Sequence, residues 1–74
     1  MMHEYELRPV EDGFEISGGR LGEPLVFRDR DIEIPVRMVG FLTCYTGGLL
    51  RRYDEDGLLI CERTFPGGEF QQTR

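Results

Sequence analysis

The feature that most constrains this chain is an Asp-Gly turn that occurs twice, each time between two extended runs. Asp12-Gly13 is followed by Phe14, and Asp56-Gly57 is followed by Leu58. Asp-Gly in this setting is a strong hairpin signal, because a tight hairpin turn needs positive φ at its central residues. Glycine adopts that conformation freely and aspartate tolerates it. The sequence therefore predicts one β-hairpin near each end of the chain.

The first hairpin has a register that separates apolar from charged side chains. A two-residue loop at Asp12-Gly13 pairs Glu11 with Phe14 and Pro9 with Ile16, whereas a three-residue loop would mix the two kinds of residue on each face. Pro9 is then expected beside a sheet edge or a bulge, because proline cannot donate to a neighbouring strand. The predicted apolar face carries Tyr5, Leu7, Pro9, Phe14 and Ile16, and the predicted polar face carries Glu4, Glu6, Arg8, Glu15 and Ser17.

The second hairpin is less clearly divided. The same register pairs Leu49 with Thr64, and Tyr53 with Ile60. It also places Arg51 opposite Glu62, which predicts a cross-strand ion pair. Neither face is cleanly polar, because one carries Leu49, Tyr53, Leu58 and Ile60 and the other carries Leu50, Leu59, Cys61 and Phe65.

Between the hairpins, a glycine-rich connection and a short apolar run lead to a predicted helix over residues 32–46. Asp29 or Asp31 is expected to cap its start, and Gly47 to end it in a left-handed conformation. Pro35 fits only in the first turn, where backbone N–H groups have no helical partner. A start at residue 34 or 35 therefore remains open.

The expected fold class is α+β, with two β-hairpins flanking one α-helix in the order ββαββ. The antiparallel sheet would carry the helix on one face. A chain of 74 residues holds one domain. That domain is expected over residues 1–66, and residues 67–74 are expected to form a flexible C-terminal tail because they lack periodicity.

The predicted helix is apolar around most of its circumference. Glu33, Arg37, Gly40 and Cys44 form one narrow stripe at helical spacing, and nearly all its other residues are apolar. A helix on one side of an open sheet needs an apolar arc of only slightly more than about 100°. The excess indicates that something covers its flanks.

The second hairpin adds apolar residues on both of its faces. The hydrophobic content of 39% is therefore average for a globular domain, but it is concentrated in the predicted helix and the second hairpin. Contiguous apolar surface usually marks an interface, and a small domain gains core by association. We therefore expect a homodimer. The alternative is that residues 18–28 fold over and cover the surplus within one monomer. The expected interface residues are Val39, Phe41, Leu42, Leu59 and Phe65.

Charge and hydropathy limit the classes of partner. Fourteen acidic residues against nine arginines give a formal net charge of −5, which disfavours nucleic acids and anionic membranes. No apolar run approaches the ~20 residues that a membrane-spanning helix needs, and the first residues lack signal-peptide character. The expected location is cytoplasmic. Cys44 and Cys61 are then expected to be reduced and buried, and a disulfide would require the fold to bring them together.

The residues offer little material for catalysis or metal binding. Aligning Gly57 with the glycine of an EF-hand loop places Arg52 and Arg63 where the first and last ligands belong, which excludes that motif. One histidine, His3, and no C-x-x-C motif make a zinc site unexpected. The only serine, Ser17, has no histidine near it in sequence. We expect no enzyme, cofactor or metal.

The turn and strand pattern resembles a group of small bacterial hairpin–helix–hairpin proteins of unknown function. The residues that carry the likeness are Tyr5-Glu6-Leu7, Asp12-Gly13-Phe14, residues 31–45 and residues 50–57. Pro35 departs from the pattern, which favours a good helix former there. The resemblance implies the fold and no activity.

Two function classes remain at this point. The first is a self-associating protein–protein interaction module whose possible protein partner is unknown. The alternative is a sheet that binds single-stranded nucleic acid through arginines and a stacking aromatic residue. The residues expected to carry that alternative are Arg8, Arg52, Arg63 and Tyr53.

Overall fold

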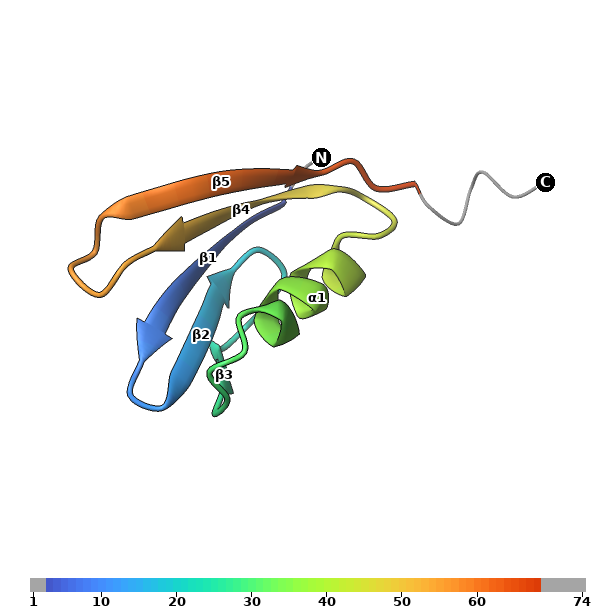
Figure 1. Cartoon of the computed structure of the whole chain (residues 1–74). Coiled ribbons are helices and arrows are strands. Elements are labelled where there is room, and N and C mark those ends of the chain that lie inside the picture. Colours follow the sequence, from blue (N-terminus) through green and yellow to red (C-terminus); the bar gives the residue numbers. More distant parts are fainter. Residues whose placement is uncertain (1–2, 69–74) are drawn as a thin grey trace.

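A computed structural model describes residues 3–68 as one mixed five-stranded sheet packed against one α-helix (Figure 1). The strands lie in the order β3-β2-β1-β4-β5, with β1 and β4 parallel and the other neighbours antiparallel. The α+β class is confirmed, whereas the fully antiparallel sheet and the ββαββ order are wrong. The elements are β1 (His3–Val10), β2 (Gly13–Gly18), β3 (Leu25–Phe27), α1 (Glu33–Leu42), β4 (Gly48–Tyr53) and β5 (Leu59–Phe65).

The additional strand is β3, which corresponds to the short apolar run after the glycine-rich connection. It extends the first hairpin by pairing with β2, so that Leu25 lies opposite Ile16 and Phe27 opposite Phe14. From β3, at one edge of the sheet, α1 carries the chain back to β4 (Figure 1). A helical crossover joins strands that run in the same direction, and this is how β4 comes to lie parallel to β1.

The first hairpin has the predicted faces but a register displaced by two residues. Pro9 pairs with Phe14, and Val10 pairs with Gly13. The loop therefore consists of Glu11 and Asp12, and Asp12 itself adopts a φ of 69°. Because side chains alternate with a period of two, a shift of two residues leaves every side chain on its predicted face.

The missing N–H of Pro9 costs the sheet no hydrogen bond to β4. The pairing of β1 with β4 ends at Leu7, opposite Arg52. Beyond that point β1 has a partner only on its β2 side, so Pro9 borders an open edge as predicted.

The second hairpin confirms most of its predicted register. Leu49 pairs with Thr64, and Arg51 pairs with Glu62. Tyr53 pairs with Leu59 instead of Ile60, because a bulge shifts the register between Arg52 and Tyr53. The part of β5 nearest the turn is therefore irregular, and the part after Ile60 is regular.

The start of α1 agrees with the sequence only in part, because the residue at the N-cap position is Ile32 and it makes no side-chain capping hydrogen bond. The Asp31 carboxylate accepts the N–H of Glu33 at 3.0 Å, and the Asp29 carboxylate accepts the N–H of Asp31 at 2.8 Å. Pro35 is buried in the first turn, where it displaces no helical hydrogen bond. The two aspartates together order the chain that enters the helix.

The helix ends at Leu42, four residues before its predicted end. The buried Thr43 hydroxyl donates to the Val39 carbonyl at 2.8 Å, and residues 43–46 form a turn. Gly47 has the predicted left-handed conformation, with φ of 81°, and its N–H closes that turn on the Thr43 carbonyl at 2.8 Å. The left-handed glycine was therefore predicted correctly, but the turn before it was not.

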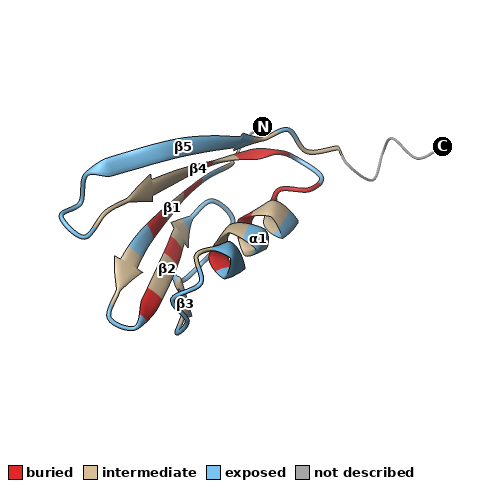
Figure 2. Cartoon of the chain, in the orientation of Figure 1, coloured by how far each residue is buried: buried red, intermediate tan, exposed pale blue. Residues whose placement is uncertain are grey.

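The core is small and lies between α1 and the middle of the sheet (Figure 2). We call the face that α1 covers the helix-side face and the opposite one the outer face. No residue of β5 belongs to the core. The buried side chains that pack together in this core are Tyr5 and Leu7 of β1, Ile16 of β2, Val39 of α1 and Leu50 of β4.

The first two residues of the predicted tail, Gly67 and Gly68, contact the rest of the chain. The Gly68 N–H donates to the Tyr45 carbonyl at 3.0 Å. A Cβ on Gly67 would overlap the Gly47 backbone. Residues 67 and 68 therefore pack on the turn after α1, which contradicts a tail starting at residue 67. Residues 69–74 lie outside the described part of the chain.

Candidate interaction surface

Strand β5 is an exposed sheet edge. Every residue from Leu59 to Thr64 is exposed, and Figure 2 shows the strand as one continuous exposed segment. Leu58, Leu59 and Ile60 expose 65%, 50% and 51% of their surface. An edge strand presents a row of unpaired N–H and C=O groups, which can pair with a strand of another chain. The opposite edge, β3, has only three residues.

The helix leaves the β4–β5 side of the sheet uncovered. α1 packs against β2, and the β4–β5 hairpin extends past it (Figure 1). On the helix-side face, this hairpin presents Arg52, Cys61 and Arg63 next to the buried Leu50, as the strand register requires. Within strands β4 and β5, the charged side chains on this face are Arg52 and Arg63, whereas Asp54, Glu55 and Asp56 of the connecting turn lie beside Arg52 at the end of the sheet.

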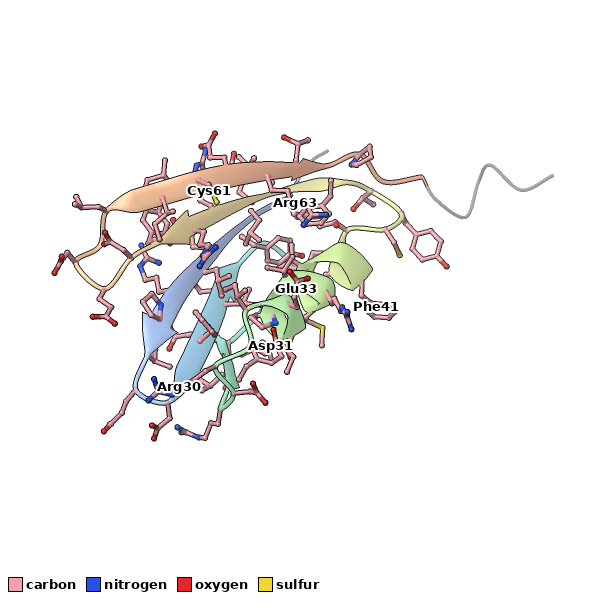
Figure 3. The ribbon with its side chains drawn as sticks, viewed as in Figure 1. Arg30, Asp31, Glu33, Phe41, Cys61 and Arg63 are labelled. Carbon is pink, nitrogen blue, oxygen red and sulfur yellow. The ribbon has the colours of Figure 1, made fainter. Side chains whose placement is uncertain are left out.

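A groove of about 380 Å³ lies between α1 and β5. The helix contributes the stripe that the sequence identified, namely Glu33, Arg37, Gly40 and Cys44. The strand side contributes Arg63 and Phe65, and the Arg63 guanidinium stacks on the Phe65 ring at 4.8 Å. Figure 3 shows Glu33 and Arg63 projecting from opposite walls.

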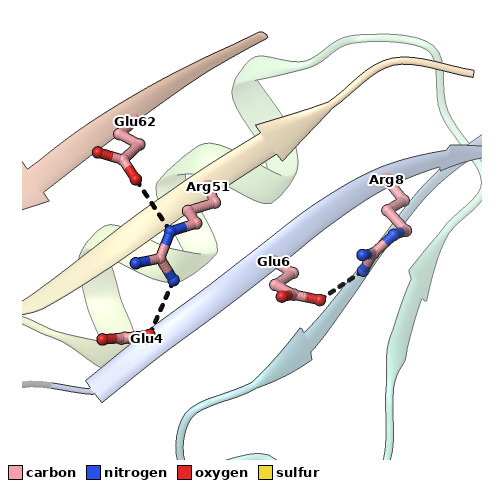
Figure 4. A network of polar contacts seen from close by, with 5 residues as sticks. All are labelled: Glu4, Glu6, Arg8, Arg51 and Glu62. Carbon is pink, nitrogen blue, oxygen red and sulfur yellow. Dashed lines mark hydrogen bonds and ion pairs between the residues drawn. The ribbon is translucent and has the colours of Figure 1, made fainter. Parts of the chain in front are cut away.

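The arginines Arg8 and Arg51 on the outer face of the sheet are paired with carboxylates of the same face (Figure 4). Arg51 donates to Glu4 at 2.8 Å and to Glu62 at 2.9 Å, which confirms the ion pair predicted with Glu62. These hydrogen bonds raise the pKa of the Arg51 guanidinium above its ordinary value. Arg8 donates to Glu6 at 2.6 Å. These five residues therefore form two separate groups of ion pairs, one around Arg51 and one between Arg8 and Glu6.

The five predicted interface residues lie in different environments. Phe41 exposes 73% of its surface and Leu59 exposes 50%, so both are available to a partner. Leu42 and Phe65 are half-buried against the core. Val39 is fully buried within the monomer, and its assignment to an interface is wrong. It faces the sheet because it lies on the covered side of α1.

The four residues of the nucleic-acid alternative do not share a surface. Arg8 and Tyr53 lie on the outer face, where the Arg8 guanidinium stacks on the Tyr53 ring at 4.4 Å. Arg52 and Arg63 lie on the helix-side face. No single surface of the sheet therefore presents all four residues.

The two cysteines form no disulfide. Cys44 exposes 7% of its surface at the end of the groove, as predicted, whereas Cys61 is exposed on β5, which corrects the expectation that it is buried. Sequence reasoning also gave no role to Ile60 or Arg37. The signal for Ile60 was available, because three consecutive apolar residues after a turn cannot all face one core.

Residues 3–68 contain no group of three or more His, Cys, Asp and Glu side chains placed to hold a metal ion. Within the same range, no helix is both long enough and apolar enough to span a bilayer. The remaining features that distinguish the chain are the β5 edge and the groove beside it. No protein-family model matches this chain, and no significant match was found among curated proteins or solved structures.

Proposed function

We propose that this protein is a self-associating interaction module that dimerises by antiparallel pairing of β5 with β5 of a second copy. The observation that carries the proposal is the exposed β5 edge, which begins with the exposed apolar residues Leu59 and Ile60 directly after the exposed Leu58. Pairing of two edges would satisfy backbone groups on both strands and join the two sheets. A twofold pair is also the commonest oligomer of soluble proteins.

The charges on β5 favour one register for this pairing. In an antiparallel twofold pair, one residue lies on the axis and faces its own copy. An axis at Glu62 or Arg63 would place like charges directly opposite each other, which is unfavourable. An axis at Cys61 avoids both clashes and places Ile60 opposite Glu62 of the second copy. We therefore place the axis at Cys61.

Light scattering across a dilution series tests the dimer. The weight-average mass is expected to fall from twice the 8.6 kDa of one chain toward 8.6 kDa as the protein is diluted. Cys61→Lys should raise the dimer dissociation constant by about tenfold or more, because at the proposed axis it places two like charges directly opposite each other. Val26→Lys on β3 is the matched control, since Val26 is 46% exposed on the opposite edge. A strictly monomeric protein at high concentration would refute the proposal.

Cross-linking through the native cysteine tests the register. Mild oxidation with copper phenanthroline is expected to join two chains through Cys61, which is exposed at the proposed axis. Cys61→Ser should abolish the covalent dimer, whereas Cys44→Ser should preserve it because Cys44 is buried. Non-reducing electrophoresis gives the readout. A dimer by light scattering that fails to cross-link would contradict an axis at Cys61 while leaving self-association intact.

A further inference from the structure

We infer that the groove between α1 and β5 binds an acidic segment of a protein partner, one in which carboxylate and apolar side chains alternate. The groove lies within one copy and does not include the backbone edge of β5, so the inference goes beyond the proposed dimer. Its charges, its open shape and its apolar lining each support this assignment.

The charges of the groove are opposite in sign to those of the whole chain. Arg37 and Arg63 line it together with one carboxylate, Glu33, whereas the chain has a net charge of −5. Among residues 3–68, neither arginine is joined to a carboxylate by an ion pair within 4.0 Å. Arg37 and Glu33 stand one helical turn apart without pairing. Two arginine guanidiniums are thus available to bind carboxylates.

The lining between the charges is apolar. Val36 and Phe41 contribute from the helix and Phe65 from the strand. At Gly40 the helix lacks a side chain, and a Cβ there would lie 3.6 Å from the Phe65 ring. The missing side chain deepens the groove next to an aromatic surface. An apolar side chain of a bound peptide can therefore be buried against this lining, while the acidic residues before and after it in the peptide contact Arg37 and Arg63.

The shape of the groove favours a polypeptide. It is an open channel between a helix and a strand, whereas small-molecule sites enclose most of the ligand surface. Single-stranded nucleic acid is less well matched, because it needs free aromatic faces for stacking and several cations for its phosphates. Here Arg63 already occupies a face of Phe65. Phe41, although exposed, would be the only other aromatic residue of the groove.

Titration with a short acetylated and amidated peptide of alternating Glu and Leu tests the inference on the full chain. Saturable amide shifts of Gly40, Phe41 and Phe65 are expected by NMR, and binding should weaken as NaCl screens the charges. The same peptide with Lys in place of Glu should bind at least about tenfold more weakly. Equal binding of both peptides, or shifts confined to the outer face, would overturn the inference.

Four variants of the groove and one control variant make this test more specific. Arg37→Gln and Arg63→Gln should each weaken binding by about three- to tenfold, whereas Glu33→Gln should strengthen it by removing the opposing charge. Arg28→Gln is the matched control, because Arg28 is exposed and lies outside the groove. Gly40→Leu should block binding without changing charge. Loss of binding in Arg28→Gln, or tighter binding of a single-stranded oligonucleotide through the same residues, would contradict a peptide site.

Discussion

Replacing Leu7 by alanine is expected to lower the free energy of unfolding of this protein by about 2–5 kcal/mol. Leu7 is fully buried on β1, in a small core cluster with Tyr5, Ile16, Val39 and Leu50. Buried leucine-to-alanine changes cost about 2–5 kcal/mol, because apolar contact is lost and a cavity remains. A domain of this length has a total stability of about 4–11 kcal/mol. A single truncation at Leu7 therefore removes a large share of the free energy of unfolding.

The measurement is urea denaturation followed by far-UV circular dichroism, with every variant at the same protein concentration. Leu58→Ala is the matched control, because it makes the same chemical change at a residue that is 65% exposed. Its free energy of unfolding should stay within about 0.5 kcal/mol of the unmodified protein. Similar losses for both variants would show that the core does not lie where the structure places it.

Burial explains why the faces of the first hairpin could be predicted. Tyr5, Leu7 and Ile16 alternate with charged residues, and only one face can meet the core. Any register that differs by two residues keeps this division, so the pattern cannot choose between such registers. The conformation of the turn determines the register, because Asp12 rather than Gly13 adopts positive φ. Local sequence signals do not distinguish these two turns.

Long-range pairing accounts for the other differences. β3 has only three residues, too few for a recognisable alternation, and it forms because β2 offers an edge to Leu25 and Phe27. The parallel pairing of β1 with β4 joins His3 to Gly48, residues far apart in sequence. Neither contact has a local signature. The sequence pattern therefore predicted elements and faces better than strand order.

The candidate site was predicted in part for a similar reason. The stripe that includes Glu33, Arg37 and Gly40 was visible from helical spacing, and it lines the groove. The opposite wall is formed by Arg63 and Phe65, and only the sheet order brings β5 to that place. Helical periodicity shows which side of a helix is distinct. It does not show which strand lies opposite.

Gly13→Ala is expected to destabilise the protein by about 3 kcal/mol or more, because its methyl group would overlap the Phe27 carbonyl oxygen. It would also come within 3.0 Å of the Arg28 Cα, so the clash is with backbone that cannot rotate away. Relief requires β3 to separate from β2, which would expose Phe14 and Phe27. The loss should therefore appear as lower thermal stability together with faster amide exchange in β3.

Two matched variants separate this steric effect from the general effect of adding a methyl group. Gly22→Ala should leave stability nearly unchanged, because no atom lies within 4 Å of the position its Cβ would occupy. Asp12→Gly should be tolerated, since Asp12 already adopts a conformation that glycine accepts easily. If Gly13 instead served the turn by its conformational freedom, the amide hydrogens of β3 would stay protected from exchange in Gly13→Ala. The protection of β3 amide hydrogens from exchange therefore shows whether Gly13 is needed for the turn or for the close approach of β2 and β3.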